Sequence, residues 1–131
     1  IVYIASPHNF HFAGAKALLE VGKPVLCEKP LTVNAAQARE LIEISRANNV
    51  FLMEAMWTRC LPIYDRVREW LDDGRIGEPR FVTSNFCTQP AFDPLNRRFN
   101  PDLAGGGLLA IEAQACLRLI SAFDLILTAS R

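Results

Sequence analysis

The stretch Val25–Pro30 has the sequence V-L-C-E-K-P, which predicts a short strand that ends in an acid, a base and a proline. Val25–Cys27 is apolar, as expected of a buried strand, and Glu28 and Lys29 follow where that strand stops. In an open parallel sheet, ligands bind at the carboxyl ends of the strands, where the chain leaves the sheet and opens a crevice. Because Pro30 disfavours helical geometry at the preceding residue, Lys29 is predicted to lie in an extended turn. Lys29 is therefore a candidate ligand-binding group, and a solvated charge pair is the alternative.

The segments on either side of this stretch alternate between strand and helix patterns. Residues 1–5 form a continuous apolar run that predicts a strand covered on both faces, and residues 50–53 predict another buried strand. Residues 10–21 and 35–48 have helical apolar spacing, and Asn34 is placed to cap the second helix. This order predicts a parallel, right-handed βαβαβ unit of the α/β class. Such a unit is one half of a doubly wound nucleotide-binding fold, whose G-x-G-x-x-G turn does not occur in these 131 residues.

The pattern changes after residue 53. Residues 54–59 are interpreted as an irregular link, and residues 61–71 predict an amphipathic helix whose inward side chains are Ile63, Val67, Trp70 and Leu71. Residues 80–87 predict a strand, and the proline-rich residues 88–104 predict a loop. Residues 108–123 are helix-like but apolar on nearly every side.

Composition narrows the classes of partner. Half of the 131 residues are apolar, 21% are charged and the net charge is zero, which argues against nucleic acid and against an anionic membrane surface as partners. The four cysteines are isolated and there are only two histidines, so reduced core thiols are favoured over a zinc site or a disulfide framework. No signal peptide or apolar run of membrane length is present, so a cytoplasmic protein is expected. Because Ile1 lies inside a predicted strand, we expect the natural sequence to extend upstream.

Three short motifs occur in a characteristic order. Ala5–His8, followed by His11, matches the pattern A-T/S-P-x-x-x-H, Glu28–Pro30 matches E-K-P, and Ile76–Pro79 matches I-G-x-[PV]. Together they resemble the Gfo/Idh/MocA oxidoreductases over residues 1–107. A finer resemblance is to the branch of dimeric dihydrodiol dehydrogenases and NADP-dependent D-xylose dehydrogenases. It rests on L-M-E-A-M-W-T-R-C-L-P at residues 52–62 and D-P-L-N-R-R-F-N-P-D-L-A-G-G-G at residues 93–107.

The resemblance implies a two-domain, homodimeric enzyme that binds NADP, with NAD possible. Residues 1–56 would be the C-terminal half of a Rossmann domain, and residues 57–131 would open an α+β substrate and dimerisation domain with an antiparallel sheet. Lys29 would be catalytic, contacting a hydroxyl of the substrate as hydride passes to the nicotinamide, and Pro30 would follow a cis peptide bond. The residues that would contact the cofactor are Ser6, Pro7, His8, His11, Glu28, Lys29, Trp57 and Arg59.

Each of these side chains also has a purely structural interpretation. His8 and His11 would then only cap and cover the first helix, Trp57 would be a packing anchor and Arg59 a solvated charge. The pair Arg97–Arg98 is interpreted as part of a solvated loop.

The resemblance ends near residue 108. The family continues with an aspartate and a tyrosine or histidine, the latter being its proposed acid–base group. This chain has Ala110 and Gln114 at those positions, or Ile111 and Ala115 in the other register, and Glu112 is out of register in both. The resemblance therefore implies an NADP-dependent dehydrogenase of a sugar such as D-xylose or of a trans-dihydrodiol, with activity of these residues alone in doubt. The alternatives are a truncated, inactive paralogue or mis-assembled gene fragment, and an inositol or glucose–fructose type of oxidoreductase.

Overall fold

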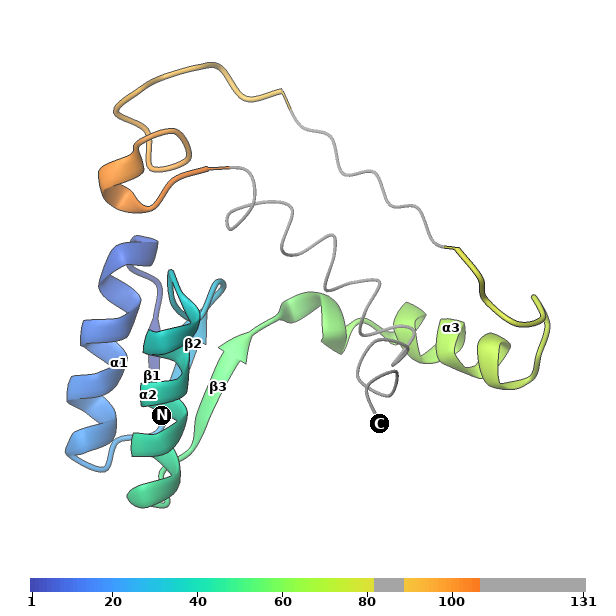
Figure 1. Ribbon diagram of the computed structural model, residues 1–131, viewed down its shortest axis with the longest axis horizontal. Helices are drawn as coiled ribbons and strands as arrows, with labels where there is room; N and C mark the ends of the chain where they lie inside the picture. Colours follow the sequence, from blue (N-terminus) through green and yellow to red (C-terminus); the bar gives the residue numbers. More distant parts are fainter. Residues whose placement is uncertain (82–88, 107–131) are drawn as a thin grey trace. The chain divides into compact units, whose positions relative to one another are not determined.

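The structure is a computed structural model that describes residues 1–81 and 89–106 (Figure 1). Of these, residues 1–55 and 90–106 form one compact unit, and residues 56–81 and 89 belong to a second. Within the described ranges, every helix is too short or too polar to cross a membrane.

The first unit contains a parallel sheet of three strands, as predicted. Its strands are β1 (Val2–Ile4), β2 (Val25–Glu28) and β3 (Leu52–Ala55), in the order β1-β2-β3. Ile4 is in register with Cys27, which is in register with Glu54, so these three residues form one row across the sheet. Because all three strands run in parallel, their carboxyl ends lie at the same edge.

Two helices cover one face of this sheet. The α1 helix (His11–Glu20) follows a short 3-10 helix, η1 (His8–Phe10), and packs beside α2 (Ala35–Ala47) (Figure 1). Asn34 caps α2 as predicted, since its Oδ1 accepts the Gln37 backbone N–H at 3.0 Å. The buried core of this layer consists of Ile4, Ala15, Leu19, Val25, Cys27 and Leu41.

Three predictions about burial are wrong. Residues 1–5 are not covered on both faces, because α1 and α2 lie on the same face and the side chain of Tyr3 on the other is 55% exposed. The third strand begins at Leu52 and includes Glu54, so the predicted strand at residues 50–53 is displaced and Met53 is exposed. Ile42, expected in the buried stripe of α2, is also exposed.

The second unit begins with a 3-10 helix, η2 (Trp57–Cys60), followed by α3 (Pro62–Asp72). The predicted helix is confirmed, and Pro62 occupies its first turn, where a missing N–H costs no helical hydrogen bond. Its predicted inward side chains are not buried, and Ile63 and Trp70 are exposed. Most of the predicted strand at 80–87, and all of the predicted helix at 108–123, lie outside the described residues.

Candidate active site

The backbone of the Lys29 turn is held on both sides. Lys29 follows β2 at the carboxyl edge of the sheet, and its N–H donates to Glu28 Oε2 at 3.1 Å. The Leu31 N–H donates to Glu54 Oε1 at 2.8 Å, and Pro30 O lies 2.7 Å from His11 Nδ1. The Lys29–Pro30 peptide bond is cis, as the resemblance implied. These contacts fix the point from which the Lys29 side chain projects.

Nearby charges act on the Lys29 amine. Burial lowers its pKa from the ordinary value, and the positive charges of Arg97 and Arg98 lower it further. The carboxylates of Glu28 and Glu54 act in the opposite direction without reversing the shift. A larger share of neutral amine is therefore present than on a solvated lysine, which suits a group that accepts or donates a proton.

The two histidines lie next to each other, His8 at the start of η1 and His11 at the start of α1. Their ring centroids are 5.7 Å apart in an edge-to-face arrangement, and both side chains are buried. His8 Nδ1 lies 3.2 Å from Ala104 O, and burial lowers the pKa of His8. His11 lies deeper, with Nδ1 2.7 Å from Pro30 O and Nε2 2.8 Å from Ser6 O. His11 thus contacts the turn after β1 and the turn after β2 together.

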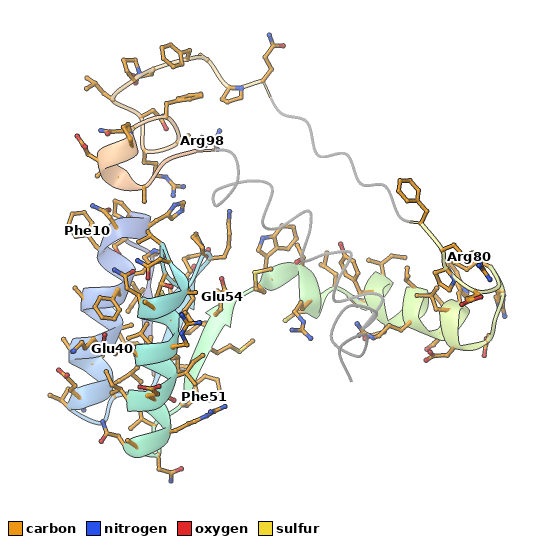
Figure 2. The ribbon with its side chains drawn as sticks, in the orientation of Figure 1. Phe10, Glu40, Phe51, Glu54, Arg80 and Arg98 are labelled. Atoms are coloured by element: carbon orange, nitrogen blue, oxygen red, sulfur yellow. The ribbon has the colours of Figure 1, made fainter. Side chains whose placement is uncertain are left out.

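The segment 90–106 brings two arginines to this edge of the sheet. Asn9 Nδ2 donates to Asp102 O at 3.0 Å, and the Gly106 N–H donates to Arg98 O at 2.9 Å. A Cβ atom at Gly105 would lie 2.7 Å from Arg97 O, so only glycine fits this close approach of two backbone segments. Figure 2 labels Arg98 in this segment and Glu54 on β3.

Glu28 also faces the uncovered side of the sheet. The Tyr3 hydroxyl donates to Glu28 Oε1 at 2.5 Å, and this hydrogen bond is the main reason that the pKa of Tyr3 is raised. Ser6 lies in the turn after β1, and its hydroxyl is buried with no hydrogen-bond partner among the described residues. A buried hydroxyl without a partner is costly, so Ser6 is a candidate for a hydrogen bond to a ligand at this edge.

The structure brings most of the predicted site residues together. Those gathered at the carboxyl ends of β1 and β2 are Ser6, Pro7, His8, His11, Glu28 and Lys29. Trp57 and Arg59 lie in η2 of the second unit, where Trp57 is exposed. Sequence reasoning placed Glu54 in an irregular link and Arg97 and Arg98 in a solvated loop, so it missed their contributions to the Lys29 site. The glycine run at residues 105–107 was the sequence signal for the close backbone approach near Arg97, whereas the position of Glu54 depends on strand pairing, which the sequence pattern does not show.

Two family models match consecutive parts of the chain. The model described as "Oxidoreductase family, NAD-binding Rossmann fold" matches residues 1–56, and "GFO/IDH/MocA C-terminal domain" matches residues 64–111. A D-xylose 1-dehydrogenase (NADP(+)) of Hypocrea jecorina is 44% identical over 117 residues, which are 83% of this chain and 30% of that protein. A trans-1,2-dihydrobenzene-1,2-diol dehydrogenase of Xenopus laevis is 42% identical over 121 residues, or 92% of this chain and 36% of that protein.

Solved structures show the same similarity. An inositol dehydrogenase homolog from Azotobacter vinelandii, complexed with NAD+, superposes with a TM-score of 0.85 at 30% identity, covering 94% of this chain and 34% of that one. The chain thus spans about a third of the length of the relatives it matches. Because the two models together match residues 1–56 and 64–111, and the sheet, the E-K-P turn and the relatives agree with them, the chain belongs to the Gfo/Idh/MocA oxidoreductase family.

Proposed function

We propose that the protein is an NADP-dependent dehydrogenase that oxidises a hydroxyl of a sugar such as D-xylose or of a trans-dihydrodiol. The observation that carries the proposal is the Lys29 turn at the carboxyl edge of a parallel sheet. Its backbone contacts Glu28 of β2, His11 of α1 and Glu54 of β3, and burial lowers the pKa of the Lys29 amine. The proposed substrate class is supported by the similarity to a D-xylose 1-dehydrogenase and to a trans-1,2-dihydrobenzene-1,2-diol dehydrogenase, which are 44% and 42% identical. The resemblance further supports a homodimer.

The residues at this edge fit a nicotinamide cofactor. The buried Ser6 hydroxyl offers a hydrogen bond that no described residue takes, and His8 and Glu28 flank the same turns. The family resemblance is the only ground for adding Trp57 and Arg59, which lie in η2, to the proposed cofactor contacts. When bound, the nicotinamide supplies the acceptor for the hydride. NADP is preferred over NAD because the Hypocrea relative is described with NADP(+), whereas an inositol dehydrogenase homolog was solved with NAD+.

Lys29 is proposed to be the group that contacts the reacting oxygen. As the carbinol carbon loses hydride, its hydroxyl must lose a proton, and a neutral amine within hydrogen-bond distance accepts that proton. Burial and the two arginines favour the neutral amine before the reaction, and Glu28 and Glu54 stabilise the ammonium that results. The lysine thereby substitutes for the tyrosine or histidine that residues 108–115 do not supply.

The test is a substrate panel measured by reduction of NADP+ or NAD+ at 340 nm. We expect reduction of NADP+ with D-xylose or a trans-dihydrodiol at a rate well above that with myo-inositol. Faster turnover of myo-inositol would assign the inositol type of reaction instead. A protein that is folded by circular dichroism and reduces neither cofactor with any of these substrates would favour the non-catalytic alternative, for which the sequence at 108–115 is the motivating observation.

A further inference from the structure

His11 has a hydrogen-bonding arrangement that a neutral imidazole cannot satisfy. Its side chain is fully buried, with Nδ1 2.7 Å from Pro30 O and Nε2 2.8 Å from Ser6 O. Backbone carbonyl oxygens only accept hydrogen bonds, whereas a neutral imidazole carries a single N–H and one bare nitrogen lone pair. In the neutral form, one of these two short contacts would bring the lone pair of a ring nitrogen against a lone pair of a carbonyl oxygen. With a proton on each nitrogen, both contacts become hydrogen bonds that His11 donates.

We propose that His11 is a buried imidazolium that bridges Ser6 O and Pro30 O and is thereby a positioning residue for Lys29. The bridge itself follows from the contacts of His11, and only the consequence for Lys29 rests on the proposed function. This role differs from a direct contact with the cofactor, because both ring nitrogens are already occupied by backbone oxygens.

The two hydrogen bonds of His11 offset part of the cost of burying its charge. Hydrogen bonds from a charged donor are roughly twice as strong as neutral ones. The turn after β2 is held from both sides by opposite charges. A cation donates to Pro30 O, and the carboxylate of Glu54 accepts the N–H of the next residue, Leu31. Among the described residues, the titratable and charged groups around the two bridged turns come from six places. They are Tyr3 on β1, His8 on η1, Cys27 and Glu28 on β2, Lys29 after β2, Glu54 on β3, and Arg97 and Arg98 in segment 90–106.

His8 is an internal control for this assignment. It is also buried, but among the described residues only Nδ1 approaches a carbonyl oxygen, at 3.2 Å from Ala104 O. Burial lowers the pKa of His8, and its contact with Ala104 O acts in the opposite direction without reversing the shift. His8 should therefore be neutral, with its proton on Nδ1, while His11 beside it carries two protons.

The experiment is nitrogen-15 NMR of the protein labelled at histidine, recorded at pH 7.5 without cofactor or substrate. The sequence contains only these two histidines, so the spectrum is simple, and a His8→Asn variant assigns it. We expect two directly protonated ring nitrogens for His11 and one for His8. A bare ring nitrogen on His11 would overturn the proposal, whether or not the protein proves to be a dehydrogenase. Two protons on both histidines would also overturn it, because the signature would then not be specific to the bridge.

A kinetic arm tests the positioning role. In His11→Gln, the side-chain amide donates without charge, and we expect kcat to fall on the order of 100-fold, the loss that a shift of about 1 Å in a reacting group causes. The KM for the nicotinamide cofactor should stay within about twofold, because the interaction that is lost acts in the transition state. A rise in that KM with kcat unchanged would show that His11 contacts the cofactor instead. If this variant does not fold, the NMR result on the unaltered protein still decides the bridge.

Discussion

Replacing Glu54 by alanine removes the acceptor that holds the far side of the Lys29 turn. Glu54 Oε1 accepts the Leu31 N–H at 2.8 Å, and both residues are half-buried. No other described group accepts this N–H in the structure, so the substitution leaves it facing a partly apolar environment. The loss should therefore include the cost of an unsatisfied donor as well as that of the hydrogen bond.

The magnitude follows from the kind of bond. Hydrogen bonds to a charged group contribute about 1.5–3 kcal/mol to stability, and the half-buried position of Glu54 supports a value of about 2 kcal/mol. The Glu54→Gln variant keeps an acceptor oxygen without its charge, so its loss should be smaller, about 1 kcal/mol. Both substitutions remove the Glu54 carboxylate, which raises the pKa of Lys29, so in either variant the pKa of Lys29 should move further below its ordinary value.

Urea unfolding followed by circular dichroism measures this loss. With a slope of about 1–3 kcal/mol per molar urea, Glu54→Ala should lower the midpoint by roughly 1 M and Glu54→Gln by about half as much. Glu43→Ala is the matched control, because Glu43 is exposed on α2 and its substitution should change stability by less than about 0.5 kcal/mol. Equal midpoints for Glu54→Ala and Glu43→Ala would refute the claim that Glu54 anchors the turn.

Two further predictions concern the loop and the buried thiol. Gly105→Ala should destabilise the protein by more than about 1 kcal/mol, because its Cβ would lie 2.7 Å from Arg97 O, whereas Gly14→Ala inside α1 should stabilise it by about 0.5–1 kcal/mol. Thermal melts compare the two variants, and a Gly105→Ala protein as stable as the parent would exclude the tight approach. Burial raises the pKa of the Cys27 thiol to about 12 from an ordinary 9.0, so the unfolded state loses this proton first and stability should fall as pH rises from 9 toward 12. Cys27→Ala should flatten that decline. At pH 8, iodoacetamide should label the exposed Cys60 in the folded protein but not the buried Cys27, and peptide mass spectrometry measures the labelling of each. Labelling of both thiols at equal rates would contradict the burial of Cys27.

Local signals in the sequence predicted the part of the site that local geometry determines. The position of Lys29 at a strand end follows from an apolar run and a proline, and both lie within the six residues Val25–Pro30. Glu54 was missed because the apolar run at residues 50–53 suggested a strand two residues early, whereas pairing with β2 sets the strand at Leu52–Ala55.

The remaining features depend on contacts between distant segments. Arg97 and Arg98 reach Lys29 only because segment 90–106 packs on η1 through Asn9, a contact between residues 93 positions apart. The paired carbonyl contacts of His11 likewise join two turns that the sequence pattern shows only as separate motifs. Periodicity predicted that α3 has an apolar stripe, but burial of that stripe requires a partner surface, which periodicity cannot specify.

The most direct test of the proposed role of Lys29 is the kcat of a Lys29→Met variant, measured with saturating NADP+ and the best substrate of the panel. Lys23→Met is the control, because Lys23 is an exposed lysine that precedes the same strand. We predict that kcat falls by about 10²–10⁴ in Lys29→Met, the usual contribution of a positioned acid–base group, and is unchanged in Lys23→Met. A Lys29→Met protein whose kcat stays within a few-fold of the parent would contradict the assignment of Lys29 as the group that transfers the hydroxyl proton.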